Sequence, residues 1–84
     1  METVYRIVIL PRGWVYVGEF HQEGTQCRLE NAFNIRYWGT SRGLGELAEG
    51  GPTDKTKLDP AGTVRFHEGA IIATLDTVVE KWRK

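Results

Sequence analysis

Three short segments of strand character near the N-terminus, each followed by a glycine-containing turn, constrain the fold most. Residues 3–10 (TVYRIVIL) are rich in β-branched side chains, and residues 14–21 (WVYVGEFH) continue the pattern. Residues 25–30 (TQCRLE) alternate apolar and polar side chains, the period of a half-buried strand. This spacing predicts an antiparallel meander. Gly18, inside the second segment, predicts a bulge or bend that lets a small sheet curl.

The rest of the chain predicts two further strands and a packed tail. After residue 30 we expect a turn at residues 31–34 and a short extended segment that ends at Trp38. Residues 63–76 (TVRFHEGAIIATLD) indicate two strands about a His-Glu-Gly turn. The tail, residues 77–84, is expected to place Val78, Val79 and Trp82 against the sheet or against a neighbouring subunit.

Between these strands lies a glycine-rich insertion, residues 39–62. Leu44, Leu47 and Ala48 recur at helical spacing, and the run Gly50-Gly51-Pro52 ends any helix, so one or two helical turns are predicted. Residues 53–62 indicate a polar loop with a turn at residues 59–62. With 84 residues in total, the chain is predicted to be a single domain, 1–84, that carries this insertion.

About 60 of the 84 positions, those outside the insertion, resemble the Sm-like small barrel in RIVILPRGWVYVGEFHQEGTQCRLENA and FHEGAIIATL. The resemblance implies a mainly β fold, a small curled five-stranded barrel of the Sm-like or SH3-like kind, here with a short helix in the insertion. It also implies a homo-oligomer, which a small core favours as well. The loop HQEGTQ is shorter than the family's uridine-binding pattern, and HEG stands where that family has an Arg-Gly pair. RNA binding is therefore an alternative that we do not favour.

Most of the chain also resembles an uncharacterised family of small phage and prophage proteins that carry strings very like NIRYWGTSRGLGELAEGGPTDKTKLDPAGTVR. This resemblance implies a phage setting and, for a phage-encoded protein, the host cytoplasm. Small phage accessory proteins often counter host defence, sometimes as sponges that sequester nucleotide signals in oligomeric pockets. The resemblance thus leads us to expect an immune-evasion protein.

Composition narrows the classes of function. The 11 Lys and Arg balance the 11 Asp and Glu, which argues against affinity built on many phosphate contacts. A single cysteine makes no internal disulfide, and with two histidines there is no zinc-ligand spacing, so we predict no metal and no cofactor. The short apolar run at the N-terminus indicates a strand and not a signal peptide or membrane span, which favours the cytoplasm.

The predicted ligand site centres on the start of the insertion. Tyr37 or Trp38 offers a face on which a base stacks, and Arg36 and Arg42 offer guanidinium groups for a phosphate. Because neighbouring strand residues face opposite ways, at least one of the two aromatic side chains is expected in the core. The remaining predicted site residues come from the entry to the helix and from the second loop: Thr40, Ser41, Lys57, Asp59 and Arg65.

These residues predict non-enzymatic binding of a small anionic, nucleotide-derived ligand. An RNA-binding ring is one alternative, and a host-protein interaction module that uses Trp14 or Trp82 is another. An enzyme is not predicted, because no acid, base and nucleophile stand in register. The letters GLGELA match a dinucleotide fingerprint, but no βαβ unit surrounds them.

Overall fold

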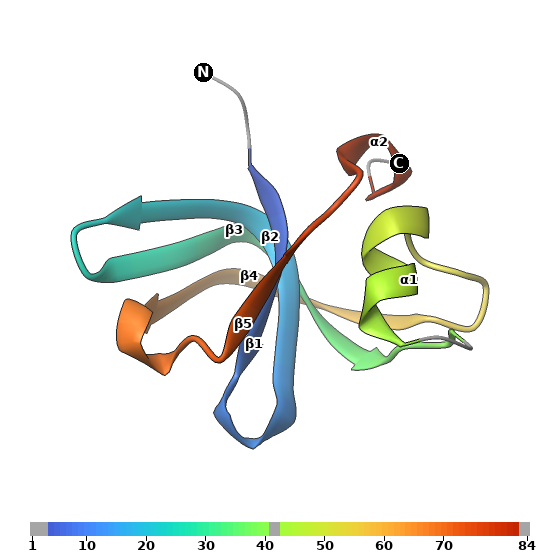
Figure 1. Cartoon of the computed structure of the whole chain (residues 1–84), viewed down its shortest axis with the longest axis horizontal. Coiled ribbons are helices and arrows are strands. Elements are labelled where there is room, and N and C mark those ends of the chain that lie inside the picture. Colours follow the sequence, from blue (N-terminus) through green and yellow to red (C-terminus); the bar gives the residue numbers. More distant parts are fainter. Residues whose placement is uncertain (1–3, 41–42, 83–84) are drawn as a thin grey trace.

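The computed structural model describes residues 4–40 and 43–82 and shows a mainly β fold with two short helices (Figure 1). The strands form one antiparallel sheet in the order β4-β3-β2-β1-β5. The elements are β1 (Tyr5–Leu10), the 3-10 turn η1 (Pro11–Gly13), β2 (Trp14–Glu23), β3 (Gln26–Tyr37), α1 (Leu44–Gly50), β4 (Lys57–His67), the 3-10 turn η2 (Glu68–Ala70), β5 (Ala73–Asp76) and α2 (Val79–Trp82).

Five antiparallel strands, the N-terminal meander and a short helix confirm the coarse fold prediction. The curled barrel is wrong, because the sheet is neither closed nor strongly curled. β4 and β5 are its two edges and do not pair with each other in the described part of the chain. β5 has only four residues, and all four pair with β1. So short a strand offers little edge for closure.

β3 is longer than predicted, because the expected turn at residues 31–34 is a bulge inside a continuous strand. Val17 pairs with Phe33 and Glu19 with Glu30, so two β3 residues oppose Gly18. A Cβ added to Gly18 would lie 3.1 Å from the Cα of Ala32. The bulge predicted at Gly18 is confirmed, and its extra residue belongs to β3.

β4 begins earlier than predicted, so the insertion is shorter. The chain is extended from Lys57 onward, and the turn expected at residues 59–62 is an irregular part of β4. Pro60 pairs opposite Phe33 on this edge strand, where a missing N–H is tolerated. The segment between β3 and β4 is residues 38–56, and we call it the insertion from here on.

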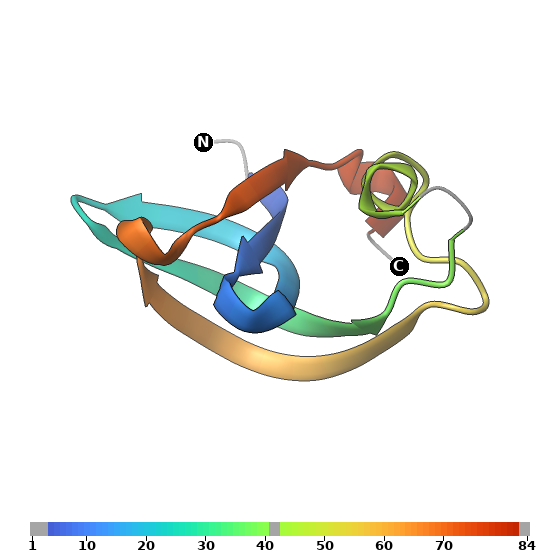
Figure 2. The same ribbon diagram turned by 60° about the horizontal axis from the view of Figure 1, so that its bottom comes forward.

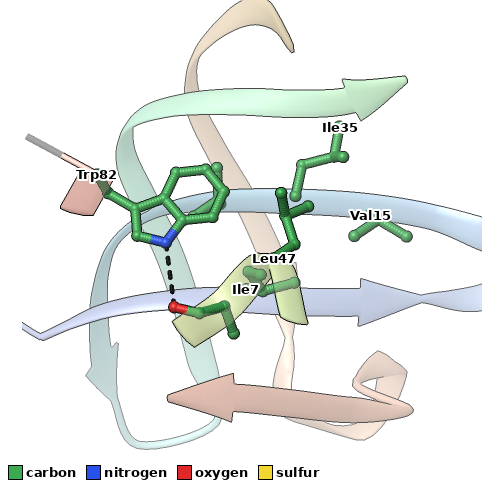
Figure 3. Packing of buried hydrophobic residues seen from close by; sticks show 7 residues of the cluster. Ile7, Val15, Ile35, Leu47 and Trp82 are labelled. Atoms are coloured by element: carbon green, nitrogen blue, oxygen red, sulfur yellow. Dashed lines mark hydrogen bonds between the residues drawn. The ribbon is translucent and has the colours of Figure 1, made fainter. Parts of the chain in front are cut away.

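Helix α1 packs against the sheet near one end, and Figure 3 shows its Leu47 among Ile7, Val15 and Ile35 from the strands. Leu47 and Ala48 are buried and join the first hydrophobic cluster, which also contains Ile7, Val15, Val17, Ile35 and Trp82. The helix ends as predicted, with the N–H of Gly51 donating to the carbonyl of Leu47. The helix predicted within GLGELAEGG is therefore confirmed, and the insertion supplies part of the core.

The C-terminal segment holds α1 in place. The backbone N–H of Val78 donates to the carbonyl of Ala48 at 3.1 Å, and the indole Nε1 of Trp82 donates to the same oxygen at 3.3 Å. In Figure 2, α1 and α2 lie side by side at one end of the sheet. The packing predicted for Trp82 is confirmed within the chain itself. Val79 is half-buried, and the prediction is wrong for Val78, which is exposed.

The opposite face of the sheet carries a second hydrophobic cluster of Val8, Leu29 and Ala32, bordered by half-buried side chains that include Phe20 and Phe66. Cys27 is buried, and desolvation followed by the charge of Glu68 raises the pKa of its thiol. Among the described residues, no helix is long and apolar enough to cross a membrane.

Candidate functional site

An open pocket of about 260 Å³ lies where β3 passes into the insertion. Its lining residues are Arg36, Tyr37, Trp38, Gly39 and Thr40. Four of these five were predicted as site residues from the sequence. We call this group the β3-end pocket.

Both aromatic side chains of the pocket are exposed, Tyr37 at 60% and Trp38 at 41%. The prediction that at least one of them belongs to the core is wrong. β3 ends at Tyr37, so the alternation of faces no longer applies to Trp38. Ile35 is the last β3 side chain that the first hydrophobic cluster covers, and Tyr37 extends past it.

Two threonines fix the backbone of the pocket from the other end of the insertion. The hydroxyl of Thr56 donates to the carbonyl of Trp38 at 2.7 Å, and the hydroxyl of Thr53 donates to the carbonyl of Gly39 at 2.9 Å. The N–H of Thr53 in turn donates to the Thr56 hydroxyl at 2.8 Å. We call Thr53 and Thr56 the threonine clasp. It joins the two arms of the insertion at the pocket.

Gly39 is required where the clasp closes, and Gly39→Ala should loosen the pocket. A Cβ at Gly39 would lie 2.5 Å from the carbonyl carbon of Lys55, and its φ is +70°. Gly62 has the same φ, but a Cβ there would have no atom of the described residues within 4 Å. We therefore expect Gly62→Ala to cost about 1–2 kcal/mol of unfolding free energy from backbone strain alone. Gly39→Ala should cost about 1–3 kcal/mol more from overpacking.

Urea denaturation of the two variants measures this difference. Equal losses for Gly39→Ala and Gly62→Ala would show that the close approach of the two arms contributes nothing, and would remove the clasp from the description of the pocket.

Arg36 is the cation that lines the pocket, and Asp59 on β4 holds it. Arg36 Nε donates to Asp59 Oδ2 at 2.8 Å, and both side chains are well exposed. A surface pair of this kind adds about 0–1 kcal/mol to stability. Its main effect is to orient the guanidinium, whose two terminal nitrogens have no hydrogen-bond partner among the described residues and can bind an anion. Lys57 is the cross-strand partner of Tyr37 and adds a second positive charge at the same end of the sheet.

Two predicted site residues, Ser41 and Arg42, lie outside the described residues. Thr40 precedes them, and its hydroxyl donates to the carbonyl of Gly43 at 2.9 Å. This hydrogen bond uses the Thr40 proton within the insertion, so Thr40 shapes the pocket wall more than it offers a donor to an anion.

Arg65 does not join the group. It lies six residues after Asp59, roughly 20 Å of extended strand away, and pairs opposite Arg28. There it contributes to the positive field around Glu30. The pKa of that carboxyl is lowered, chiefly by the hydrogen bond from Arg28. Desolvation opposes this shift, and the charges of Arg28, His21 and Arg65 add to it. The expectation that Arg65 closes over the ligand rested on a loop at residues 53–62, most of which is strand.

A second open pocket, also of about 260 Å³, was not predicted. Its lining residues are Arg12, Gly13, Trp14, Asn34, Ile35 and Arg36. Trp14 stacks on Tyr16 with ring centroids 6.3 Å apart and planes inclined by 12°, and it stays 54% exposed. These residues lie about 20 positions apart along the chain, and only the register of β2 against β3 brings them together. Arg36 lines both pockets.

Comparison with protein-family models, with curated proteins and with solved structures found no match. The interpretation of the site therefore depends on its own geometry.

Proposed function

We propose that this protein is a non-enzymatic binder of a small anionic ligand of the nucleotide class, held in the β3-end pocket. The observation that carries the proposal is the exposure of two adjacent aromatic side chains, Tyr37 and Trp38, next to the oriented guanidinium of Arg36. An aromatic face stacks on any nucleobase, and a guanidinium pairs with a phosphate. Exposed aromatic residues that the core does not use are typical of recognition surfaces.

The pocket is held in shape before a ligand arrives, which supports binding. The threonine clasp fixes the carbonyls of Trp38 and Gly39, and α1 anchors the far arm of the insertion in the core. A preorganised site loses less conformational entropy on binding. A volume of about 260 Å³ is just below the usual range for small-molecule sites, so we expect one pocket to hold no more than a single nucleoside unit.

The proposal includes assembly with further copies of the chain. β4 is an edge strand of 11 residues, and one side of it has no partner strand in the described part of the chain. A long unpaired edge is a template for pairing with another chain. Its N-terminal part carries Lys57 and Asp59, so an edge-to-edge contact would bring a second copy near the pocket.

Sedimentation equilibrium at micromolar concentration measures the assembly. We expect a mass above 9.5 kDa that falls to 9.5 kDa on a Thr63→Pro substitution. Thr63 is exposed and has no cross-strand partner in the register of β3 with β4, and proline there removes a backbone donor from the edge strand. A wild-type protein that sediments only as a 9.5 kDa monomer would contradict this part of the proposal.

Thermal-shift measurements with mononucleotides, dinucleotides, cyclic nucleotides and ADP-ribose derivatives test binding itself. A ligand at 100 times its dissociation constant should raise the unfolding free energy by about 2.7 kcal/mol. Tyr37→Ala should weaken the binding of that ligand by roughly 5- to 150-fold, since loss of one stacking partner costs about 1–3 kcal/mol. Tyr37 is 60% exposed, so the variant should keep its unliganded melting temperature.

Trp14→Ala is the matched control, because Trp14 is an aromatic residue of similar exposure, 54%, in the second pocket. It should leave ligand affinity unchanged. If Trp14→Ala weakened ligand binding and Tyr37→Ala did not, the binding site would be the second pocket. If no nucleotide of the panel shifts the melting temperature of the wild-type protein, the exposed aromatic residues would favour the protein-interaction module.

In a phage, the proposed ligand would be a host immune signal, and the protein would sequester it as a sponge.

A further inference from the structure

A group of three side chains of the kinds that bind metal ions, Glu19, His21 and Glu30, lies on β2 and β3, apart from both pockets. Glu19 and Glu30 are directly opposite each other in the register of the two strands. His21 follows Glu19 by two residues, so strand alternation places it on the same face. A carboxylate oxygen from each glutamate and an imidazole nitrogen of His21 lie within 4.8 Å of one another.

In each of the two glutamates, one carboxylate oxygen accepts a hydrogen bond from a residue outside the group. Arg28 Nε donates to Glu30 Oε2 at 2.7 Å, and Asn31 Nδ2 donates to Glu19 Oε2 at 3.1 Å. The other oxygen of Glu30, Oε1, lies 3.6 Å from His21 Nε2. Hydrogen bonds that hold one oxygen of a carboxylate and leave the other free are the usual outer partners of metal ligands.

The ring nitrogen Nε2 of His21 lacks a hydrogen-bond partner in the described part of the chain. This nitrogen is shielded from solvent, although the ring is 39% exposed, and it has no hydrogen-bond partner among the described residues. A shielded polar atom without a partner costs about 1–3 kcal/mol. Two carboxylates directly opposite each other on neighbouring strands are also unfavourable. A cation bound between the three side chains would remove both penalties.

We propose that Glu19, His21 and Glu30 bind one divalent transition-metal ion of the zinc type. A neutral imidazole with two carboxylates is a donor set that Zn²⁺ accepts, whereas Mg²⁺ and Ca²⁺ prefer oxygen ligands alone. The sequence predicted no metal because residues 19, 21 and 30 match no zinc spacing.

Isothermal titration of the metal-stripped full chain with ZnCl₂ tests the proposal. We expect one ion per chain, and an affinity at least about tenfold lower for His21→Ala and for Glu30→Gln. His67→Ala is the matched control, because His67 is the other histidine of the sequence and is exposed. It lies at the end of β4, where its Nδ1 accepts a hydrogen bond from the N–H of Gly69. This variant should bind zinc as the wild type does. MgCl₂ should give no heat of binding.

A thermal melt of each metal-free variant supplies the folding control, and zinc should raise the melting temperature of the wild type but not of His21→Ala. Wild-type affinity in His21→Ala, or loss of binding in His67→Ala instead, would overturn the proposal. So would the absence of stoichiometric zinc binding by the wild type, which would leave His21 and Glu30 as a simple ion pair.

Discussion

Leu47→Asp should lower the free energy of unfolding by more than about 3 kcal/mol and the melting temperature by more than about 12 °C. Leu47 is fully buried in the first hydrophobic cluster, between α1 and the sheet. Its replacement removes apolar packing and forces a carboxylate into a site without a partner. Domains of this size have little stability to lose. Circular dichroism with thermal and urea denaturation measures the effect.

The matched control is Gly45→Asp, which adds the same carboxylate two residues earlier on α1. Gly45 is exposed, and a Cβ there would have no atom of the described residues within 4 Å. An acidic side chain in the first helical turn is favourable, so this variant should be neutral or slightly stabilising. An equal loss in both variants would attribute the effect to charge, and an unchanged Leu47→Asp would show that α1 does not pack on the sheet.

Trp82→Ala should lower the free energy of unfolding by about 3–5 kcal/mol. Trp82 lies in the first hydrophobic cluster, 7% exposed, and its ring also lies 6.1 Å from that of Tyr5 on β1. The substitution removes this packing and also one of the two donors to the Ala48 carbonyl at the end of α1. Because the C-terminal segment holds α1, we expect loss of amide protection across residues 44–51 in hydrogen exchange.

Trp82→Phe separates the two contributions. Phenylalanine keeps much of the apolar packing but lacks the indole donor, and the bond to Ala48 is 3.3 Å long. A net hydrogen bond contributes about 0.5–1.5 kcal/mol, so the Phe variant should lose far less stability than the Ala variant. Similar losses in the two would contradict the account of Trp82 as mainly a packing residue.

Local patterns predicted the strands, the bulge at Gly18 and the helix, because each depends on neighbours in the sequence. β-branched runs, a glycine inside a strand and apolar residues spaced by three and four carry that information directly. The turn expected at residues 31–34 failed for the opposite reason. Asn31 adopts a φ of +51°, a value typical of turns. The residues on both sides of it pair with β2 and β4, so β3 continues past it.

The candidate site was predictable only where its residues are consecutive. Arg36, Tyr37, Trp38 and Thr40 stand next to one another in the sequence and line one pocket. Distant members depend on strand register, which single-sequence patterns do not carry. The register separates Arg65 from the pocket, and it brings Trp14 to Asn34 and Glu19 to Glu30. The exposure of both aromatic side chains depends on where β3 ends, a boundary that tertiary packing decides.

Chemical-shift mapping of the backbone amides tests the central claim most directly. The ¹⁵N-labelled protein is titrated with whichever nucleotide of the panel gives the largest thermal shift. The account predicts that the perturbed amides concentrate at residues 36–40 and at the threonine clasp, Thr53 and Thr56, and that Tyr37→Ala abolishes the perturbation. Perturbations centred on Trp14 and Arg12, or none with any nucleotide of the panel at millimolar concentration, would contradict it.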